Sequence, residues 1–129
     1  MIAADTNVWV RYLTNDNPGQ AQKALRLFKR GDEVFVPKTV LWELEWVLRA
    51  VYHLPAASIH KAIVHVLGLP VVQVEQPEQV ARALALYHKG ADFADALHVT
   101  GSGQSVPFYT FDRKLHRQAK KWDEAVVLL

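Results

Sequence analysis

Short apolar runs alternate with amphipathic segments along the whole chain. The runs are three or four residues long and nearly all apolar, which predicts strands at residues 2–4, 34–36, 71–74, 108–110 and 125–128. Between them, apolar residues recur at the spacing of a helix. The predicted helices cover residues 8–13, 21–29, 39–52, 58–67, 77–88, a short stretch from about residue 92, and 113–121. Turn-forming residues predict loops at residues 15–19 and 101–103.

This order of elements predicts an α/β fold. Short strands that are apolar on both faces are typical of a parallel sheet covered by helices on both sides. We therefore expect a three-layer α/β/α architecture around a parallel sheet of four to five strands. The 129 residues contain no repeat and no Gly/Ser-rich linker, so we expect a single domain over residues 1–129.

Composition narrows the class of protein. Half of the residues are hydrophobic (50%), which is enough for a packed core, and no apolar run approaches the ~18 residues of a membrane span. The N-terminal residues show no basic leader followed by an apolar stretch, so we expect no secretory signal. The lack of cysteine excludes a disulfide framework and thiolate chemistry. These features agree with a cytoplasmic protein.

Two carboxylates follow predicted strands. Asp5 comes directly after the first strand and Asp112 two residues after the fourth. In an open parallel sheet, function gathers at the carboxyl ends of the strands, and we expect Asp5 at a buried strand end. Each residue also has a purely structural explanation as the N-cap of the helix that follows.

Two glutamates of the helix predicted at residues 39–52 differ in their expected surroundings. Its apolar stripe is taken to run through residues 40, 44, 47, 48 and 51. Glu43 then lies at the edge of the stripe, whereas Glu45 lies farther round the helix. We expect Glu43 to be partly buried and Glu45 to be solvated. A partly buried carboxylate needs a cation or a hydrogen-bond donor, which a nearby lysine could also provide.

Asp92 and Asp95 are three residues apart and can face the same side of a short helix. A capping arrangement, with Asp92 as the cap and Asp95 reaching back, explains the first better than the second. If three or four of the candidate carboxylates point into one cleft, they repel one another and raise their own pKa values. A divalent metal relieves that repulsion, and oxygen ligands suit Mg²⁺ or Mn²⁺. Such a metal promotes phosphodiester hydrolysis without a protein nucleophile.

The acidic positions resemble those of the PIN domain, most closely the VapC-type toxins of prokaryotic toxin–antitoxin pairs. The likeness spans essentially the whole chain. It rests on Asp5-Thr6-Asn7 after the first strand, Glu43 in a mid-chain helix, the segment DFADALH at residues 92–98, and Thr110-Phe111-Asp112. The resemblance implies an endoribonuclease that depends on Mg²⁺ or Mn²⁺, acts on tRNA or another structured RNA, and leaves a 5′-phosphate and a 3′-hydroxyl. It also implies a homodimer that a cognate antitoxin protein inhibits.

The resemblance also implies a role for each residue. Asp5 and Asp95 are expected as the principal metal ligands, and Glu43 and Asp112 as the other members of an acidic quartet that holds the metal or orients water. The expected supporting residues are Thr6, Asn7 and Thr110, with Asp92 as an auxiliary ligand.

Charge and aromatic residues suggest partners. The formal net charge is only +2, but five of the 15 Lys and Arg residues lie within residues 113–121. We expect Arg113, Lys114 and Arg117 to bind RNA phosphates, although a solvated helix face explains such a run as well. Trp42 and Trp46 lie largely opposite the apolar stripe, which suggests an interface with a second copy or an antitoxin, unless the helix at 58–67 covers them.

Other functions stay open from the sequence. A non-catalytic binding module that uses the tryptophan face fits the same fold. A receiver-like signalling domain would need an aspartate at the end of the third strand, where residues 71–75 (VVQVE) offer none. No motif distinguishes RNA from DNA as the substrate. The six histidines are interpreted as surface or partly hydrogen-bonded residues, although His98, one turn after Asp95, could approach the site.

Overall fold

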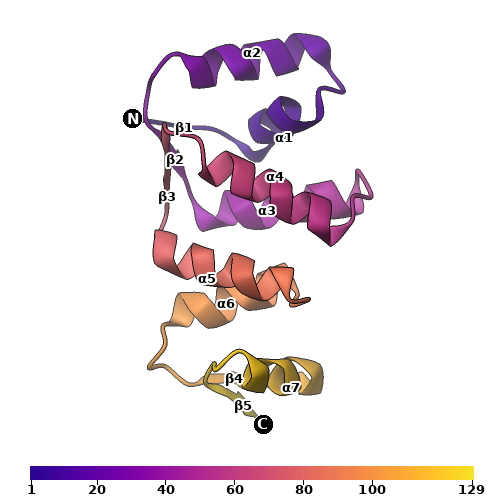
Figure 1. Cartoon of the computed structure of the whole chain (residues 1–129), viewed down its shortest axis with the longest axis vertical. Helices are drawn as coiled ribbons and strands as arrows, with labels where there is room; N and C mark the ends of the chain where they lie inside the picture. Colours follow the sequence, from indigo (N-terminus) through magenta and orange to yellow (C-terminus); the bar gives the residue numbers. More distant parts are fainter. The chain divides into compact units, whose positions relative to one another are not determined.

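The computed structural model describes all 129 residues as seven helices and five strands (Figure 1). The chain groups into two compact units, residues 1–75 and 76–129. The first unit contains β1 (Ile2–Ala3), α1 (Thr6–Thr14), α2 (Pro18–Lys29), β2 (Val34–Val36), α3 (Lys38–Ala50), α4 (Ala56–Leu67) and β3 (Val72–Val74). The second contains α5 (Pro77–His88), α6 (Phe93–Ser102), β4 (Phe108–Thr110), α7 (Arg113–Lys121) and β5 (Val126–Leu128).

In the first unit, three parallel strands pair in the order β1-β2-β3. Ile2 and Ala3 pair with Val34 and Phe35, which in turn pair with Val72 and Gln73. Val34 and Val36 are fully buried, so the central strand belongs to the core of this unit.

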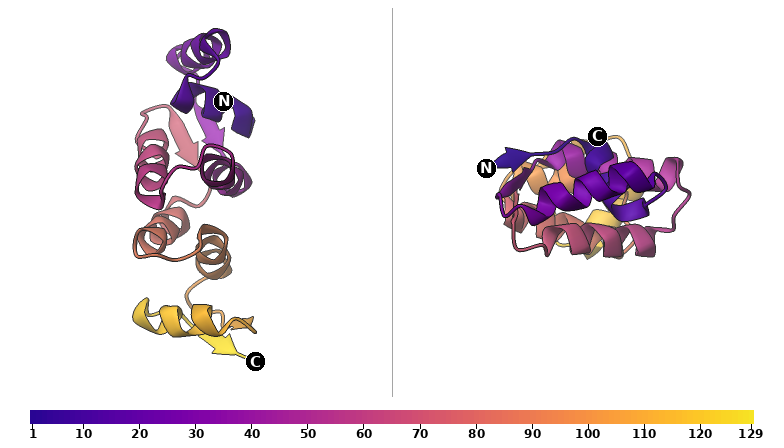
Figure 2. Two further views of the ribbon diagram at one scale, coloured as in Figure 1. Left: turned by 90° about the vertical axis from the view of Figure 1, so that its right-hand side faces the viewer. Right: turned by 90° about the horizontal axis from the view of Figure 1, so that it is seen from above.

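Helices α1 and α2 lie side by side and are held by an aromatic cluster (Figures 1 and 2). The fully buried Trp9 of α1 stacks on Phe28 of α2 with 4.1 Å between ring centroids, and Tyr12 meets Phe28 edge-on at 5.4 Å. Tyr12 also shares a hydrogen bond of 2.7 Å with His65 of α4. Large aromatic side chains packed in these geometries add specific orientation to the burial of apolar surface.

In the second unit, α5 and α6 lie side by side (Figure 2). Tyr87 of α5 packs against Phe93 of α6 with 5.1 Å between ring centroids. Strands β4 and β5 are parallel, and Tyr109 pairs with Val127. Helix α7 contacts both strands and buries Leu115 and Ala119. An ion pair between Arg82 and Glu124 ties α5 to the loop before β5.

All twelve elements predicted from the sequence are present, and two predicted loops are shorter than expected. Pro18 and Gly19 open α2, because the side chain of Asn17 caps the helix by accepting from the Gln20 N–H at 3.2 Å and proline suits the first helical position. Gly101 and Ser102 form the last turn of α6, which ends before Gly103 with its φ of 96°.

The α/β class and the parallel pairing of all strands are confirmed, but the pairing forms two sheets. The expected sheet of four to five strands is divided into the three strands of the first unit and the two of the second. The apolar pattern identifies a strand, but for a strand of only two or three residues it does not predict which other strand it pairs with. No helix combines the length and the apolar character that crossing a membrane requires.

Candidate acidic site

Asp5 caps the helix that follows the first strand. It has extended backbone angles, and its Oδ1 accepts a hydrogen bond from the Thr6 N–H at 2.7 Å. The expectation that Asp5 lies at a buried strand end is wrong, because its side chain is exposed. The reason is local, since β1 is only two residues long and Ala3 at its end is itself exposed.

The two residues after Asp5 have opposite environments. Thr6 is only 2% exposed, and its Oγ1 has no hydrogen-bond partner within the protein. A buried hydroxyl without a partner carries a desolvation cost, and its burial keeps this oxygen out of reach of a ligand in this structure. Asn7 is exposed and lines a pocket.

The expectations for the two glutamates of α3 are wrong in both cases. The buried stripe of this helix runs through residues 41, 44, 45 and 48, and Val51 at the far end is exposed. This rotation carries Glu45 into the core, where it is 3% exposed and accepts from the Arg49 Nε at 2.9 Å. Glu43 consequently lies on the exposed side. An exposed carboxylate has no need of an internal partner and stays accessible to a ligand.

Asp92 and Asp95 share the first turn of α6. Asp92 is the N-cap, and its Oδ1 accepts from the Asp95 N–H at 3.0 Å. The capping interpretation of Asp92 is therefore confirmed. The cap leaves the Asp95 carboxylate itself half-buried at the same end of the helix.

Asp112 and Thr110 form a second capping arrangement in the same unit. The Asp112 Oδ1 accepts from the Leu115 N–H at 3.1 Å and so caps α7. The Thr110 Oγ1 accepts from the Asp112 N–H at 3.0 Å. The threonine hydroxyl thus fixes the backbone that carries the aspartate, while its supporting role in a metal site stays a prediction.

The charges of these aspartates act on one another. The pKa of Asp95 is raised above 3.8, first because the carboxyl is partly buried and then because the negative charges of Asp92 and Asp112 lie near it. His98 opposes this shift. Asp92 and Asp112 therefore lie near enough to Asp95 for their charges to act on its carboxyl, and a cation would relieve that repulsion.

The predicted quartet is divided between the two units. Asp5 and Glu43 belong to the first, and Asp95 and Asp112 to the second. No group of three or more His, Asp or Glu side chains is arranged closely enough to hold a metal ion. The chemistry of the donors nevertheless fits a divalent cation, because each acidic position offers exposed or half-buried carboxylate oxygens.

Cations follow the second cluster of acids directly. Arg113 and Lys114 open α7 next to Asp112, Arg117 follows one turn later, and all three are exposed. Lys120 and Lys121 are exposed as well. Helix α7 therefore carries exposed cations directly after its acidic N-cap Asp112, as the sequence predicts, whereas their binding to RNA stays a prediction.

Trp42 and Trp46 are half-exposed on α3, at 47% and 48% of their surface. Helix α4 packs on α3 without covering them. The alternative that this neighbouring helix buries both indoles is wrong, while an interface at this face stays a prediction.

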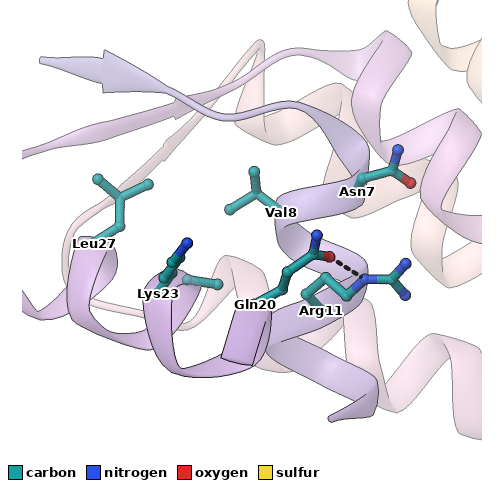
Figure 3. Close-up of a pocket in the computed structure, with 7 residues that line it drawn as sticks. Asn7, Val8, Arg11, Gln20, Lys23 and Leu27 are labelled. Carbon is teal, nitrogen blue, oxygen red and sulfur yellow. Dashed lines mark hydrogen bonds between the residues drawn. The ribbon is translucent and has the colours of Figure 1, made fainter. Parts of the chain in front are cut away.

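One pocket was missed by sequence reasoning. It has a volume of about 320 Å³ and lies between α1 and α2, where seven residues line it, six of them labelled in Figure 3. Gln20 and Lys23 are among them, and neither belongs to a recognisable motif. The only signal in the sequence is the proximity of Asn7 to Asp5.

A sequence model of the PIN domain family matches residues 2–121, which includes all the acidic positions described above. No curated protein matches the chain significantly. The family match confirms the predicted PIN-like α/β fold class.

Proposed function

Because the chain belongs to the PIN domain family, we propose that it is a metal-dependent endoribonuclease and the toxin of a type II toxin–antitoxin pair. PIN domains are typically metal-dependent nucleases, which places the chain among hydrolases at that coarse level. They occur in VapC toxins and also in other nucleases. The RNA substrate, the toxin role, the choice of Mg²⁺ or Mn²⁺, and the antitoxin and second copy as partners are therefore part of the proposal.

The gathering of Asp92, Asp95 and Asp112 is the observation that best supports the proposal. Two of these acids satisfy helix N-termini, but capping does not account for the half-buried Asp95 carboxylate, whose pKa is raised first by burial and then by the charges of the other two. A metal held by Asp95 would relieve the repulsion that its carboxyl feels from the two neighbouring charges.

Each carboxylate has a proposed part in the reaction. Asp5 and Asp95 are the principal metal ligands, and Glu43 and Asp112 hold the metal or orient the attacking water. A divalent metal, when bound, supplies a Lewis acid for the phosphoryl oxygen and a water of lowered pKa. Thr110 keeps Asp112 in position through its backbone N–H.

The remaining residues support binding. Asp92 acts as an auxiliary acid, Thr6 steadies the Asp5 carboxylate through its backbone N–H, and Asn7 presents an exposed amide two residues after Asp5. The cations Arg113, Lys114 and Arg117 bind the RNA backbone, which an acidic pocket alone would repel.

The test is cleavage of total cellular RNA by the purified protein with Mn²⁺, with Mg²⁺ and with EDTA, alongside a single-stranded DNA. We expect discrete RNA fragments that carry a 5′-phosphate, disappear in EDTA and have no counterpart with DNA. Cleavage that persists in EDTA would rule out the metal-dependent mechanism. Cleavage of DNA alone would support the nuclease activity and contradict RNA as the substrate.

The toxin role has its own test. Expression of the protein in a bacterial host is expected to arrest growth, and Asp95→Asn is expected to abolish the arrest. Asp123→Asn is the matched control, since Asp123 is an exposed aspartate of the same unit with a φ of 57°, a conformation that asparagine tolerates. Growth arrest by the Asp95→Asn variant at the same protein level would contradict this role.

A further inference from the structure

The pocket between α1 and α2 lies beside the first predicted metal ligand. Asn7 lines it and is two residues after Asp5, at the exposed start of the same helix. Its volume of about 320 Å³ is at the lower end of the range for small-ligand sites. Whatever binds in the pocket is therefore small and contacts the helix that Asp5 caps.

The lining is mostly apolar and includes two amide side chains. Val8 of α1 and Ala24 and Leu27 of α2 provide the apolar part. Figure 3 shows Asn7 and Gln20 on opposite helices of the same pocket. Flipped nucleobases are bound in this way, with apolar side chains on the flat faces and hydrogen bonds to the polar edge.

Gln20 is held in place by a network that leaves its amide nitrogen available. The Arg11 Nε donates to the Gln20 Oε1 at 2.7 Å, drawn as the dashed line in Figure 3. The same guanidinium donates through Nη1 to Asp16 at 2.9 Å and to the Tyr52 hydroxyl at 3.1 Å. A side chain whose orientation is fixed loses less entropy on binding, so Gln20 is prepared to donate to an acceptor.

Cations extend from the pocket along α2. Lys23 lines both this pocket and a neighbouring depression that Arg26 and Arg30 also line. Arg30 is paired with Asp32 at 3.1 Å, whereas Lys23 and Arg26 take part in none of the ion pairs described above. Exposed cations next to a base-sized pocket suit the phosphates that flank a base.

We propose that the α1–α2 pocket binds one base of the RNA substrate next to the cleaved phosphodiester, with Lys23 and Arg26 on the adjoining phosphates. This inference rests on the proposed nuclease function. It adds the residues that determine which base of the RNA the protein prefers. RNA is favoured over a protein segment because amide groups, apolar surface and cations occur together here, which matches a nucleotide.

The test reads binding separately from cleavage. Each of the four ribonucleoside monophosphates is titrated into the isotope-labelled protein in EDTA and followed by NMR. We expect one of them to shift the side-chain amide signals of Asn7 and Gln20 and the backbone signals of Lys23 and Leu27 most strongly. Shifts confined to other parts of the protein, or equal and weak shifts with all four, would overturn the proposal.

Two variants have matched controls on the same helix. Gln20→Ala is compared with Gln22→Ala, and Lys23→Ala with Lys29→Ala; the control residues are exposed and do not line this pocket. Gln20→Ala is expected to weaken the preferred nucleotide about tenfold and to reduce the preference among bases. Lys23→Ala is expected to weaken a short single-stranded RNA and to lower the salt slope of its binding by about 0.7.

The outcomes separate this inference from the proposed function. If the wild type cleaves RNA but Gln20→Ala and Lys23→Ala behave like their controls in binding, the pocket proposal is wrong and the nuclease stands. If both variants lose nucleotide binding while no RNA is cleaved under any condition, the pocket is supported and the nuclease is overturned. If both variants bind nucleotides normally but lose an inhibitory protein partner, the occupant is a protein segment and the proposal fails.

Discussion

Asp95 shows most directly how single residues conflict with the stability of this fold. Its pKa is raised because the carboxyl is partly buried and because Asp92 and Asp112 add negative charge around it. The folded state therefore binds a proton more readily than the unfolded state does. Wild-type stability is consequently expected to fall as the pH rises from below 3.8 through the raised pKa, and to level off above it.

Replacing Asp95 by asparagine removes this charge. We expect Asp95→Asn to increase the free energy of unfolding at pH 7, and the gain to disappear near pH 3, where the carboxyl is protonated in both states. Urea unfolding at the two pH values measures the difference. An equal effect at both pH values would mean that packing, and not charge, explains it.

Asp92→Asn tests the neighbouring charge separately, because asparagine caps a helix as well as aspartate does. The variant is expected to lower the pKa of Asp95 while leaving it above its usual value, since the burial remains. Carboxyl carbon titration by NMR measures it. A pKa of Asp95 that does not move would show that Asp92 is not an electrostatic neighbour.

The roles of residues at helix N-termini could be predicted from the sequence. The burial of residues on the sides of a helix could not. Asp92 and Asp112 stand directly before helices, so their capping roles follow from position. The predicted environments of Glu43 and Glu45 were the reverse of those observed. A modest rotation of the buried stripe of α3 toward Leu41 decides which of the two faces the core. Periodicity fixes the existence of an apolar face better than its centre.

At the level of elements, three helices begin at predicted acidic positions. Asp5, Asp92 and Asp112 cap α1, α6 and α7. This double use means that loss of activity in an alanine variant would not by itself identify a metal ligand. The type of substitution therefore matters.

Asparagine and alanine variants separate capping from metal binding. Asp5→Asn is expected to unfold like the wild type, whereas Asp5→Ala is expected to lose about 1 kcal/mol of stability. Both are expected to lose cleavage. Thermal or urea unfolding together with an RNA cleavage assay gives the two readouts, and cleavage retained by Asp5→Asn would leave Asp5 with only its capping role.

Four elements have the predicted limits, namely the strands at residues 34–36 and 108–110 and the helices at 77–88 and 113–121. The other eight differ from the prediction by one to three residues at an end or had no predicted end, and in α2 the Asn17 cap explains the difference, because it extends the helix backward over Pro18 and Gly19. Strand partners were not predictable, because residues of similar apolar character occupy every strand.

At the scale of the whole molecule, one family match spans both compact units, since residues 2–121 lie on either side of the division at residue 75. The acidic quartet is distributed over both units in the same way. A single domain over residues 1–129 stays a prediction. The candidate acids and their order could be read from the sequence. Their spatial arrangement around a metal could not, because a residue pattern does not specify distances between side chains.

The half-exposed Trp42 and Trp46 suggest how two copies associate. We expect the protein to be a dimer by sedimentation and the double variant Trp42→Ala/Trp46→Ala to be a monomer, because buried tryptophans dominate interface energies. Val106→Ala is the control, as this similarly exposed apolar residue lies in the other unit. A wild type that is monomeric at all accessible concentrations would contradict the expectation.

The most direct test of the central claim is the rate at which single carboxylate variants cleave one RNA oligonucleotide in Mn²⁺. The variants are Asp5→Asn, Glu43→Gln, Asp95→Asn and Asp112→Asn, with Asp123→Asn as the control. Mutation of residues that merely orient metal ligands already lowers metal affinity or activity about 10- to 100-fold. Each of the four variants is therefore expected to cleave about 100-fold more slowly than the wild type, or slower still. Asp123→Asn is expected to cleave at the wild-type rate. Wild-type rates for the variants of either unit would contradict a metal-dependent nuclease that requires the acids of both.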